Sequence, residues 1–154
     1  MAQRSKKDQI ADAALPLFLE HGIKGTSVDM VVKASGVSKP TVYNHFQDKS
    51  QLFEHVIARW LQVQPEPAFR ATSDAALFKE MSKQWLSPDA CRLYGLCLGE
   101  GGRAPDAVKL FFDRYDQPWR AALEARGNTL NLANDGLQAS ASHRLLTSLL
   151  ERVP

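Results

Sequence analysis

The chain has 154 residues, of which 44% are hydrophobic and 23% are charged, and its formal net charge is +2. A folded chain of this length buries roughly 70% of the surface of its unfolded form, so it needs no disulfide or metal ion for stability. No apolar run approaches the roughly 18 residues of a membrane span, and the N-terminus lacks the apolar core of a secretion signal.

The two cysteines, Cys91 and Cys97, do not have a metal-binding or redox-motif spacing. We expect buried free thiols and a reducing cytoplasmic location. The charge is unevenly distributed, because residues 1–60 hold eight Lys and Arg against six Asp and Glu, whereas residues 61–154 hold eleven of each. This excess is compatible with an anionic partner for the N-terminal part.

Apolar residues at helical spacing predict four helices in the first third of the chain. We expect them at about residues 5–21, 27–35, 39–46 and 49–63. Ser5 and Asp48 are suited to begin the first and fourth helices as N-cap residues. Pro16 lies inside the first helix and is expected to kink it, because proline removes a backbone hydrogen bond.

Four further helices are predicted in the rest of the chain. We expect them at about residues 75–86, 88–98, 106–126 and 137–153. Pro118 should interrupt the third of these. Residues 62–74 contain two prolines and show no helical period, so they form the best linker. No stretch has a convincing strand pattern, and the predicted fold class is all-α.

The segment between the second and third helices breaks one helix and starts another within four residues. Gly36 stands where a helix C-terminus needs a left-handed residue, and Val37 supplies the apolar contact that accompanies such a cap. Ser38 can cap the next helix, and Pro40 lies in its first turn, where a missing N–H costs little. This layout predicts a helix-turn-helix, whose second helix enters the major groove of DNA.

The third helix has an apolar inward face, with Val42 and Phe46, and a polar outward face. Phosphate contacts need hydrogen-bond donors, which are available on Lys39, Thr41, Tyr43 and His45. Lys49, at the start of the fourth helix, adds a second anion site. Base edges need short, directional side chains near the start of the helix, and the candidates are Ser38, Lys39, Thr41 and Asn44. The alternative is an ordinary solvated helix face.

The segments LFLEHGIKGTSV, ASGVSKPTVYNHF and DKSQLF together resemble the DNA-binding domain of TetR-family transcriptional regulators. The resemblance covers residues 5 to about 60. Carried over by position, it implies phosphate contacts by Tyr43, His45 and Lys49. It implies that Lys39, Pro40, Thr41 and Asn44 face the bases. The resulting set of expected DNA-binding residues is Thr26, Ser38, Lys39, Pro40, Thr41, Tyr43, Asn44, His45 and Lys49.

The resemblance implies an all-helical homodimer that binds double-stranded operator DNA and a small-molecule effector. Residues 1–48 would form the helix-turn-helix head, and residues 49–154 the regulatory and dimerisation domain. Val32 and Ser35 depart from the family pattern, in which alanine is common at both positions.

Residues 86–123 resemble the sensor domain of one TetR subgroup through Glu100, Arg103, Pro105 and Pro118. Only 27 residues follow Gly127, which is room for one full helix. Either the dimer uses the helices at 106–126 and 137–153, or the chain is truncated relative to the family.

Aromatic residues are enriched in the C-terminal half, and they could line a pocket for an apolar or aromatic ligand or form a core. The predicted pocket residues are Trp85, Tyr94, Phe111, Phe112, Tyr115 and Trp119. No histidine shows a metal spacing, and no nucleophile motif is present, so we expect no metal, no cofactor and no enzymatic activity.

The sequence therefore predicts a ligand-responsive repressor that binds a palindromic operator as a dimer, in the cytoplasm and on the nucleoid. One alternative is a ligand-independent autorepressor or architectural DNA-binding protein with a shortened sensor domain. The other is a small helical enzyme or interaction adaptor, which would show no salt-dependent binding to duplex DNA.

Overall fold

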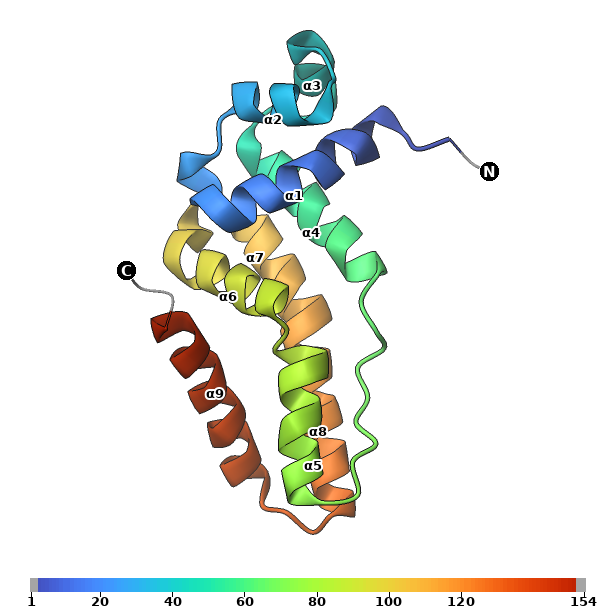
Figure 1. Cartoon of the computed structure of the whole chain (residues 1–154), viewed down its shortest axis with the longest axis vertical. Helices are drawn as coiled ribbons and strands as arrows, with labels where there is room; N and C mark the ends of the chain where they lie inside the picture. Colours follow the sequence, from blue (N-terminus) through green and yellow to red (C-terminus); the bar gives the residue numbers. More distant parts are fainter. Residues whose placement is uncertain (1–2, 152–154) are drawn as a thin grey trace. The chain divides into compact units, whose positions relative to one another are not determined.

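The computed structural model describes residues 3–151, in which helices are joined by short segments and no strand occurs. The all-α prediction is confirmed (Figure 1). The elements are α1 (Lys6–Gly25), α2 (Val28–Ser35), α3 (Lys39–His45), α4 (Lys49–Gln62), α5 (Asp74–Glu80), the π-helix η1 (Met81–Trp85), α6 (Pro88–Glu100), the 3₁₀ turn η2 (Gly101–Arg103), α7 (Pro105–Phe111), the π-helix η3 (Phe112–Asp116), α8 (Gln117–Thr129) and α9 (Asn134–Leu150).

The chain divides into two compact units. The first runs to Gln64 and also takes in Leu96–Phe112, and the second comprises Pro65–Gly95 and the chain from Asp113 onward. The division of function between residues 1–48 and 49–154 stays a prediction. By packing, α4 belongs to the first unit, because it lies against both α1 and α7.

The first unit is built on the crossing of α1 and α4, which Figure 1 shows. Phe18 of α1 meets Phe53 of α4 edge to face, with ring centroids 5.1 Å apart. Ser5 accepts a hydrogen bond from the Asp8 N–H, and Asp48 accepts one from the Gln51 N–H, so both expected caps are present. Helix α1 continues to Gly25, past the expected end at residue 21.

Gly22 explains how α1 can extend this far. Its backbone is not helical (φ 76°, ψ 179°), so the residues after it form a reoriented last turn. The positive φ favours glycine, which has no Cβ to clash. Thr26 follows that turn with its side chain buried. The hydroxyl of Thr26 donates to the carbonyl oxygens of Leu17 and Gly22.

Two of the predicted helices contain a π-helical turn. The predicted helix at 75–86 is α5 followed by η1, and the predicted helix at 106–126 is α7, η3 and α8 in succession. Pro118 lies in the first turn of α8, directly after η3, so the interruption at Pro118 is confirmed. A π-helical turn shifts the hydrogen-bond register, which accommodates a residue without an N–H.

The end of the second unit differs from the expected boundaries. Helix α8 extends to Thr129 and α9 starts at Asn134, so the gap of residues 127–136 between the two predicted helices shortens to residues 130–133. Gly127 is buried inside α8, where a Cβ would lie within 2.2 Å of a Leu137 methyl carbon. The missing side chain therefore lets α9 pack closely on α8. The last residues of the predicted helix at 137–153 lie outside the described part.

Candidate nucleic-acid interface

The turn between α2 and α3 has the predicted geometry. Gly36 is left-handed (φ 68°, ψ 13°), and its N–H donates to the Val32 carbonyl at 3.0 Å. Val37 is buried next to it. Ser38 is the N-cap of α3 and Pro40 lies in the first turn, where no N–H is needed. The direction of α3 relative to α2 is therefore determined by the residues of the turn itself.

Helix α3 presents a polar face to solvent. Val42 and Phe46 are buried beneath it, as predicted. Pro40, Tyr43, Asn44 and His45 are exposed, and the Tyr43 side chain is 48% exposed. Exposed side chains that make few bonds within the protein can exchange water for a nucleic acid at little cost. This face brings together four of the nine expected DNA-binding residues as free surface.

Ser38 and Thr41 share their hydrogen bonds. Their hydroxyl oxygens are 2.8 Å apart, and the Thr41 N–H donates to the Ser38 hydroxyl at 3.4 Å. The Ser38 side chain thus caps the helix and is paired with the next candidate along it. Because a hydroxyl has one donor and two acceptor sites, both groups keep capacity for a further bond.

Lys39, the first residue of α3, forms an ion pair with Asp29 on α2. The ammonium lies 2.8 Å from a carboxylate oxygen of Asp29. The hydrogen bond that Lys39 donates to Asp29 and the negative charge of that carboxylate raise the pKa of Lys39 above its ordinary value. Lys39 is therefore a cation. Its partner, Asp29, lies on α2, the first helix of the helix-turn-helix.

Lys49 and Thr26 are engaged inside the protein. The Lys49 ammonium donates to the carbonyl oxygens of Ile23 (3.0 Å) and Lys24 (3.4 Å) at the end of α1. The Thr26 side chain is 1% exposed, and its hydroxyl proton is already donated. DNA contacts by these two residues stay predictions, and a contact through the Thr26 side chain would require it to leave its buried position.

A carboxylate from α6 completes a clamp on the same segment of α1. Glu100 accepts hydrogen bonds from the N–H groups of Ile23 and Lys24, both at 2.9 Å. Lys49 binds the carbonyls of those two residues from the other side. The backbone after Gly22 is therefore held at both its donors and its acceptors, which fixes the last turn of α1.

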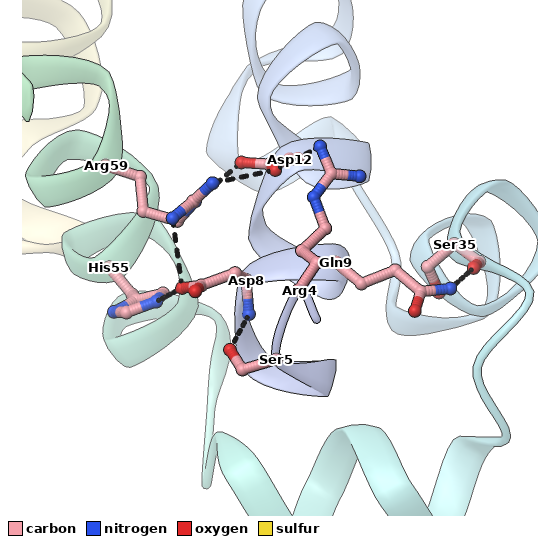
Figure 2. A network of polar contacts seen from close by, with 8 residues as sticks. All are labelled: Arg4, Ser5, Asp8, Gln9, Asp12, Ser35, His55 and Arg59. Carbon is pink, nitrogen blue, oxygen red and sulfur yellow. Dashed lines mark hydrogen bonds and ion pairs between the residues drawn. The ribbon is translucent and has the colours of Figure 1, made fainter. Parts of the chain in front are cut away.

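A polar network fastens α1 to α4 beneath the interface (Figure 2). The Arg59 guanidinium binds both carboxylate oxygens of Asp12, at 2.6 and 2.9 Å. Asp8 lies 3.1 Å from the His55 ring nitrogen and 3.2 Å from Arg59. Arg4 reaches Asp12 from the other side, at 2.7 Å. Two-pronged pairs of this kind fix orientation as well as distance.

A separate hydrogen bond joins α1 to the turn through Gln9. Its side-chain amide donates to the Ser35 carbonyl at 2.8 Å, at the last residue of α2 (Figure 2). The pairs Asp8–His55 and Asp12–Arg59 could not be predicted from the sequence, because the partners on α1 and α4 are 47 positions apart. The one feature of the sequence that favours these contacts is the presence of charged residues beside the apolar stripes of both helices.

The predicted ligand-pocket residues do not all belong to one unit. Phe111 and Phe112 lie in the first unit, where Phe111 is buried and packs near Trp60, with ring centroids 6.1 Å apart. The other four, Trp85, Tyr94, Tyr115 and Trp119, lie in the second unit and are buried. We call these four the aromatic cluster.

The aromatic cluster is internally hydrogen-bonded. The Trp85 indole N–H donates to the Tyr94 hydroxyl, which donates to Asp116 at 2.6 Å. The Tyr115 hydroxyl donates to the Trp85 carbonyl at 2.7 Å. Burial raises the pKa of both tyrosines, so they remain protonated donors. This arrangement agrees with the core alternative, whereas a role in ligand binding stays a prediction.

The other chemical groups are consistent with a structural role. Cys91 and Cys97 are buried and unbridged, as predicted, and burial raises the pKa of Cys97 to about 12. Within residues 3–151, no group of three or more His, Cys, Asp or Glu residues could hold a metal ion. No helix in the same range is long and apolar enough to span a membrane.

The fold and the turn define a helix-turn-helix protein, and the comparisons with known proteins identify the family. Residues 10–56 match the family model described as bacterial regulatory proteins, tetR family. The chain belongs to this family.

Three relatives illustrate the extent of the match. The transcriptional repressor ComR of Escherichia coli K12 is 36% identical over 48% of this chain and 33% of its own length. The structure of the flavonoid-responsive regulator FrrA is 30% identical, covers 80% of this chain and 69% of that one, and has a TM-score of 0.55.

A Mesorhizobium loti protein of the TetR family covers 94% of this chain and 95% of its own, with a TM-score of 0.62 and 19% identity. This third match shows the fold alone. The segments matched in the curated relatives span about a third of their length.

Proposed function

We propose that this chain is a DNA-binding transcriptional regulator whose helix α3 enters the major groove. The observation that carries the proposal is the exposed polar face of α3, held at a fixed angle by the Gly36–Ser38 turn. A recognition helix needs this combination, because its side chains must reach base edges while its buried face remains packed. The names of the relatives, among them a repressor, support the same class.

The proposed roles follow from the chemistry of each side chain. Tyr43 and His45 contact phosphates, which hold the protein in register on the duplex. Asn44 reads a base edge, since an amide can pair with the donor and acceptor of adenine. Thr41 and Pro40 lie near the start of α3 and approach the bases with Ser38 and Lys39. Lys49, at the start of α4, and Thr26, directly after α1, complete the interface.

We further propose a homodimer that binds a palindromic operator and represses transcription. A dimer places two recognition helices about 34–36 Å apart, in successive major grooves. Leu146 and Leu150 of α9 are more than half exposed, which supports a partner surface on this helix. The expected dimerisation segments are α7 to α8 together with α9. The protein would then act in the cytoplasm and on the nucleoid.

A small-molecule effector is the third part of the proposal. The relative FrrA is flavonoid-responsive, which supports an effector for this chain as well. An effector releases DNA only if it binds one arrangement of the dimer more tightly than the other. The packed aromatic cluster favours the second candidate, a regulator that binds DNA without an effector. In either case, we propose residues 1–48 as the reading head and 49–154 as the regulatory domain.

The proposal is tested by selecting genomic fragments that the purified protein retains. The selected duplex and a scrambled duplex of equal length are then titrated at several salt concentrations. We expect tighter binding to the selected duplex, with both affinities falling steeply as salt rises. Equal, salt-independent retention of all fragments would contradict a DNA-binding regulator. An effector is then sought as a compound that shifts both the melting temperature and the affinity for the selected duplex.

A further inference from the structure

The pair of Asp29 and Lys39 differs from the ion pairs that join α1 to α4. Asp8 and Asp12 bind Arg59 and brace α1 against α4, and the Asp48 carboxylate caps α4. Asp29 instead binds the ammonium of a residue on the proposed recognition helix, at 2.8 Å. Both side chains are open to solvent, with 75% of Asp29 and 52% of Lys39 exposed. The pair is therefore on the surface and braces no buried contact.

We propose that Asp29 is a specificity-determining residue that withholds Lys39 from the phosphates of non-specific DNA. The inference rests on the proposed DNA-binding function and deepens it. Non-specific binding comes almost entirely from cations that neutralise phosphates. A lysine already paired with a carboxylate adds no net charge to that interaction. Asp29 thereby removes one cation from the protein's affinity for bulk DNA.

The position of Lys39 makes this effect selective. Lys39 is the first residue of α3, and residues at the start of a recognition helix are those that reach base edges. At the correct site a lysine there can donate to the two acceptors of guanine, O6 and N7. On any other sequence the lysine would only replace Asp29 by a phosphate. The freed carboxylate faces the polyanion in both cases, and only at the correct site do the bonds to guanine offset that cost. The carboxylate thus penalises wrong sequences more than the right one.

An exposed pair suits this role because it opens readily. Exposed ion pairs contribute little to stability, since water and salt screen them. Lys39 can therefore leave Asp29 when a better acceptor is offered. Replacing Asp29 should change the choice between DNA sequences and leave the fold intact.

The test is a double-mutant cycle on full-length protein with Asp29→Asn, Lys39→Gln and the double variant. Each protein is titrated with the selected duplex and with the scrambled duplex across a salt series. Glu20→Gln is the matched control, because it removes the same charge from an exposed residue of the same unit, on α1 and outside the helix-turn-helix. Asp29→Ser serves as a second neutral variant, and Asp29→Glu keeps the charge. Urea unfolding confirms that every variant is folded.

We expect Asp29→Asn to tighten binding to the scrambled duplex about threefold or more at low salt and to steepen its salt slope by about one. The preference for the selected duplex should fall accordingly. Asp29→Glu should behave as the wild type, and Glu20→Gln should change either affinity less than twofold. In the Lys39→Gln background, Asp29→Asn should have no more effect than Glu20→Gln has.

Two results would overturn the inference. In one, Asp29→Asn and Asp29→Ser match Glu20→Gln on the scrambled duplex. In the other, the effect of Asp29→Asn persists undiminished without Lys39, so that the carboxylate acts by charge alone. Both results leave the wild type binding DNA, so they are distinct from failure of the proposed function, in which no duplex shows salt-dependent binding.

Discussion

The outward face of α3 and the aromatic cluster of the second unit are both made of polar and aromatic side chains, yet they differ in where their polar atoms bond. On α3, Tyr43, Asn44 and His45 are exposed to water. In the cluster, the polar atoms of Trp85 and Tyr94 are buried and bond to one another and to Asp116. Exposed polar groups are available to bind another molecule, whereas buried polar groups that bond to one another stabilise the fold.

The largest expected effect is a loss of unfolding free energy caused by a substitution in the aromatic cluster. Trp119→Ala should destabilise the fold by about 3–5 kcal/mol, because the fully buried ring packs against Phe69 and Tyr115 and its loss leaves a cavity. Urea unfolding measures the change. Trp119→Phe is the control and should cost less, since the Trp119 indole N–H has no hydrogen-bond partner among the described residues. A loss below about 1 kcal/mol for the alanine variant would show that the ring does not belong to the core.

A matched pair of tyrosines tests the comparison itself. Tyr94→Phe removes a hydroxyl that bonds both Trp85 and Asp116. We expect a loss of about 1–3 kcal/mol in unfolding free energy, because the buried Trp85 N–H loses its acceptor and Asp116 keeps only the bonds from Arg120. Tyr43→Phe removes an exposed hydroxyl and should leave stability within about 0.5 kcal/mol.

DNA binding should show the opposite pattern for the same two variants. Tyr43→Phe should weaken binding to the selected and the scrambled duplex alike and leave the salt slope nearly unchanged, as expected for a phosphate contact made by an uncharged hydroxyl. Folded Tyr94→Phe protein should bind both as the wild type does. The distinction between the α3 face and the aromatic cluster would be wrong if Tyr43→Phe and Tyr94→Phe lowered the unfolding free energy equally and also weakened DNA binding equally.

Asn44→Ala sharpens the comparison within the α3 face. We expect it to relax the preference at one base pair by about 1–3 kcal/mol, because the amide reads a base edge. The measurement compares the affinities of duplexes that carry each of the four base pairs at every position of the site. Equal weakening on all duplexes would instead make Asn44 a phosphate contact.

The smallest effect concerns the network that supports the α3 face. The hydrogen bond to His55 and the nearby Arg59 charge lower the pKa of Asp8 below its ordinary value of 3.8. A carboxyl whose pKa is lower in the folded state contributes stability that is complete above about pH 4 and is lost as the pH falls through the folded-state value. Asp8→Asn should therefore reduce the loss of stability below pH 4.

The sequence was informative where structure is local. Gly36, Ser38 and Asp48 act through neighbours within four residues, so the turn and the start of α4 could be predicted from spacing alone. The clamp of Glu100 on α1 joins residues more than 70 positions apart, and no pattern along the chain encodes such a contact. The same holds for the pairing of Arg59 with Asp12.

Residue type alone also could not separate engaged groups from free ones. Lys49 and Thr26 have the chemistry of DNA contacts, yet their side chains bond to backbone carbonyls at the end of α1. The aromatic residues of the C-terminal half could have lined a pocket or formed a core, and this choice depends on packing in three dimensions. Exposure, which the sequence does not give, decides how such residues are interpreted.

The central claim is that the exposed face of α3 binds DNA. It is tested most directly by a triple variant, Tyr43→Ala, Asn44→Ala and His45→Ala, titrated with the selected duplex across a salt series beside the wild type. We predict that the wild type binds with steep salt dependence. The variant should lose that binding while unfolding at nearly the same urea concentration. A folded variant that binds the duplex as tightly as the wild type would contradict the account.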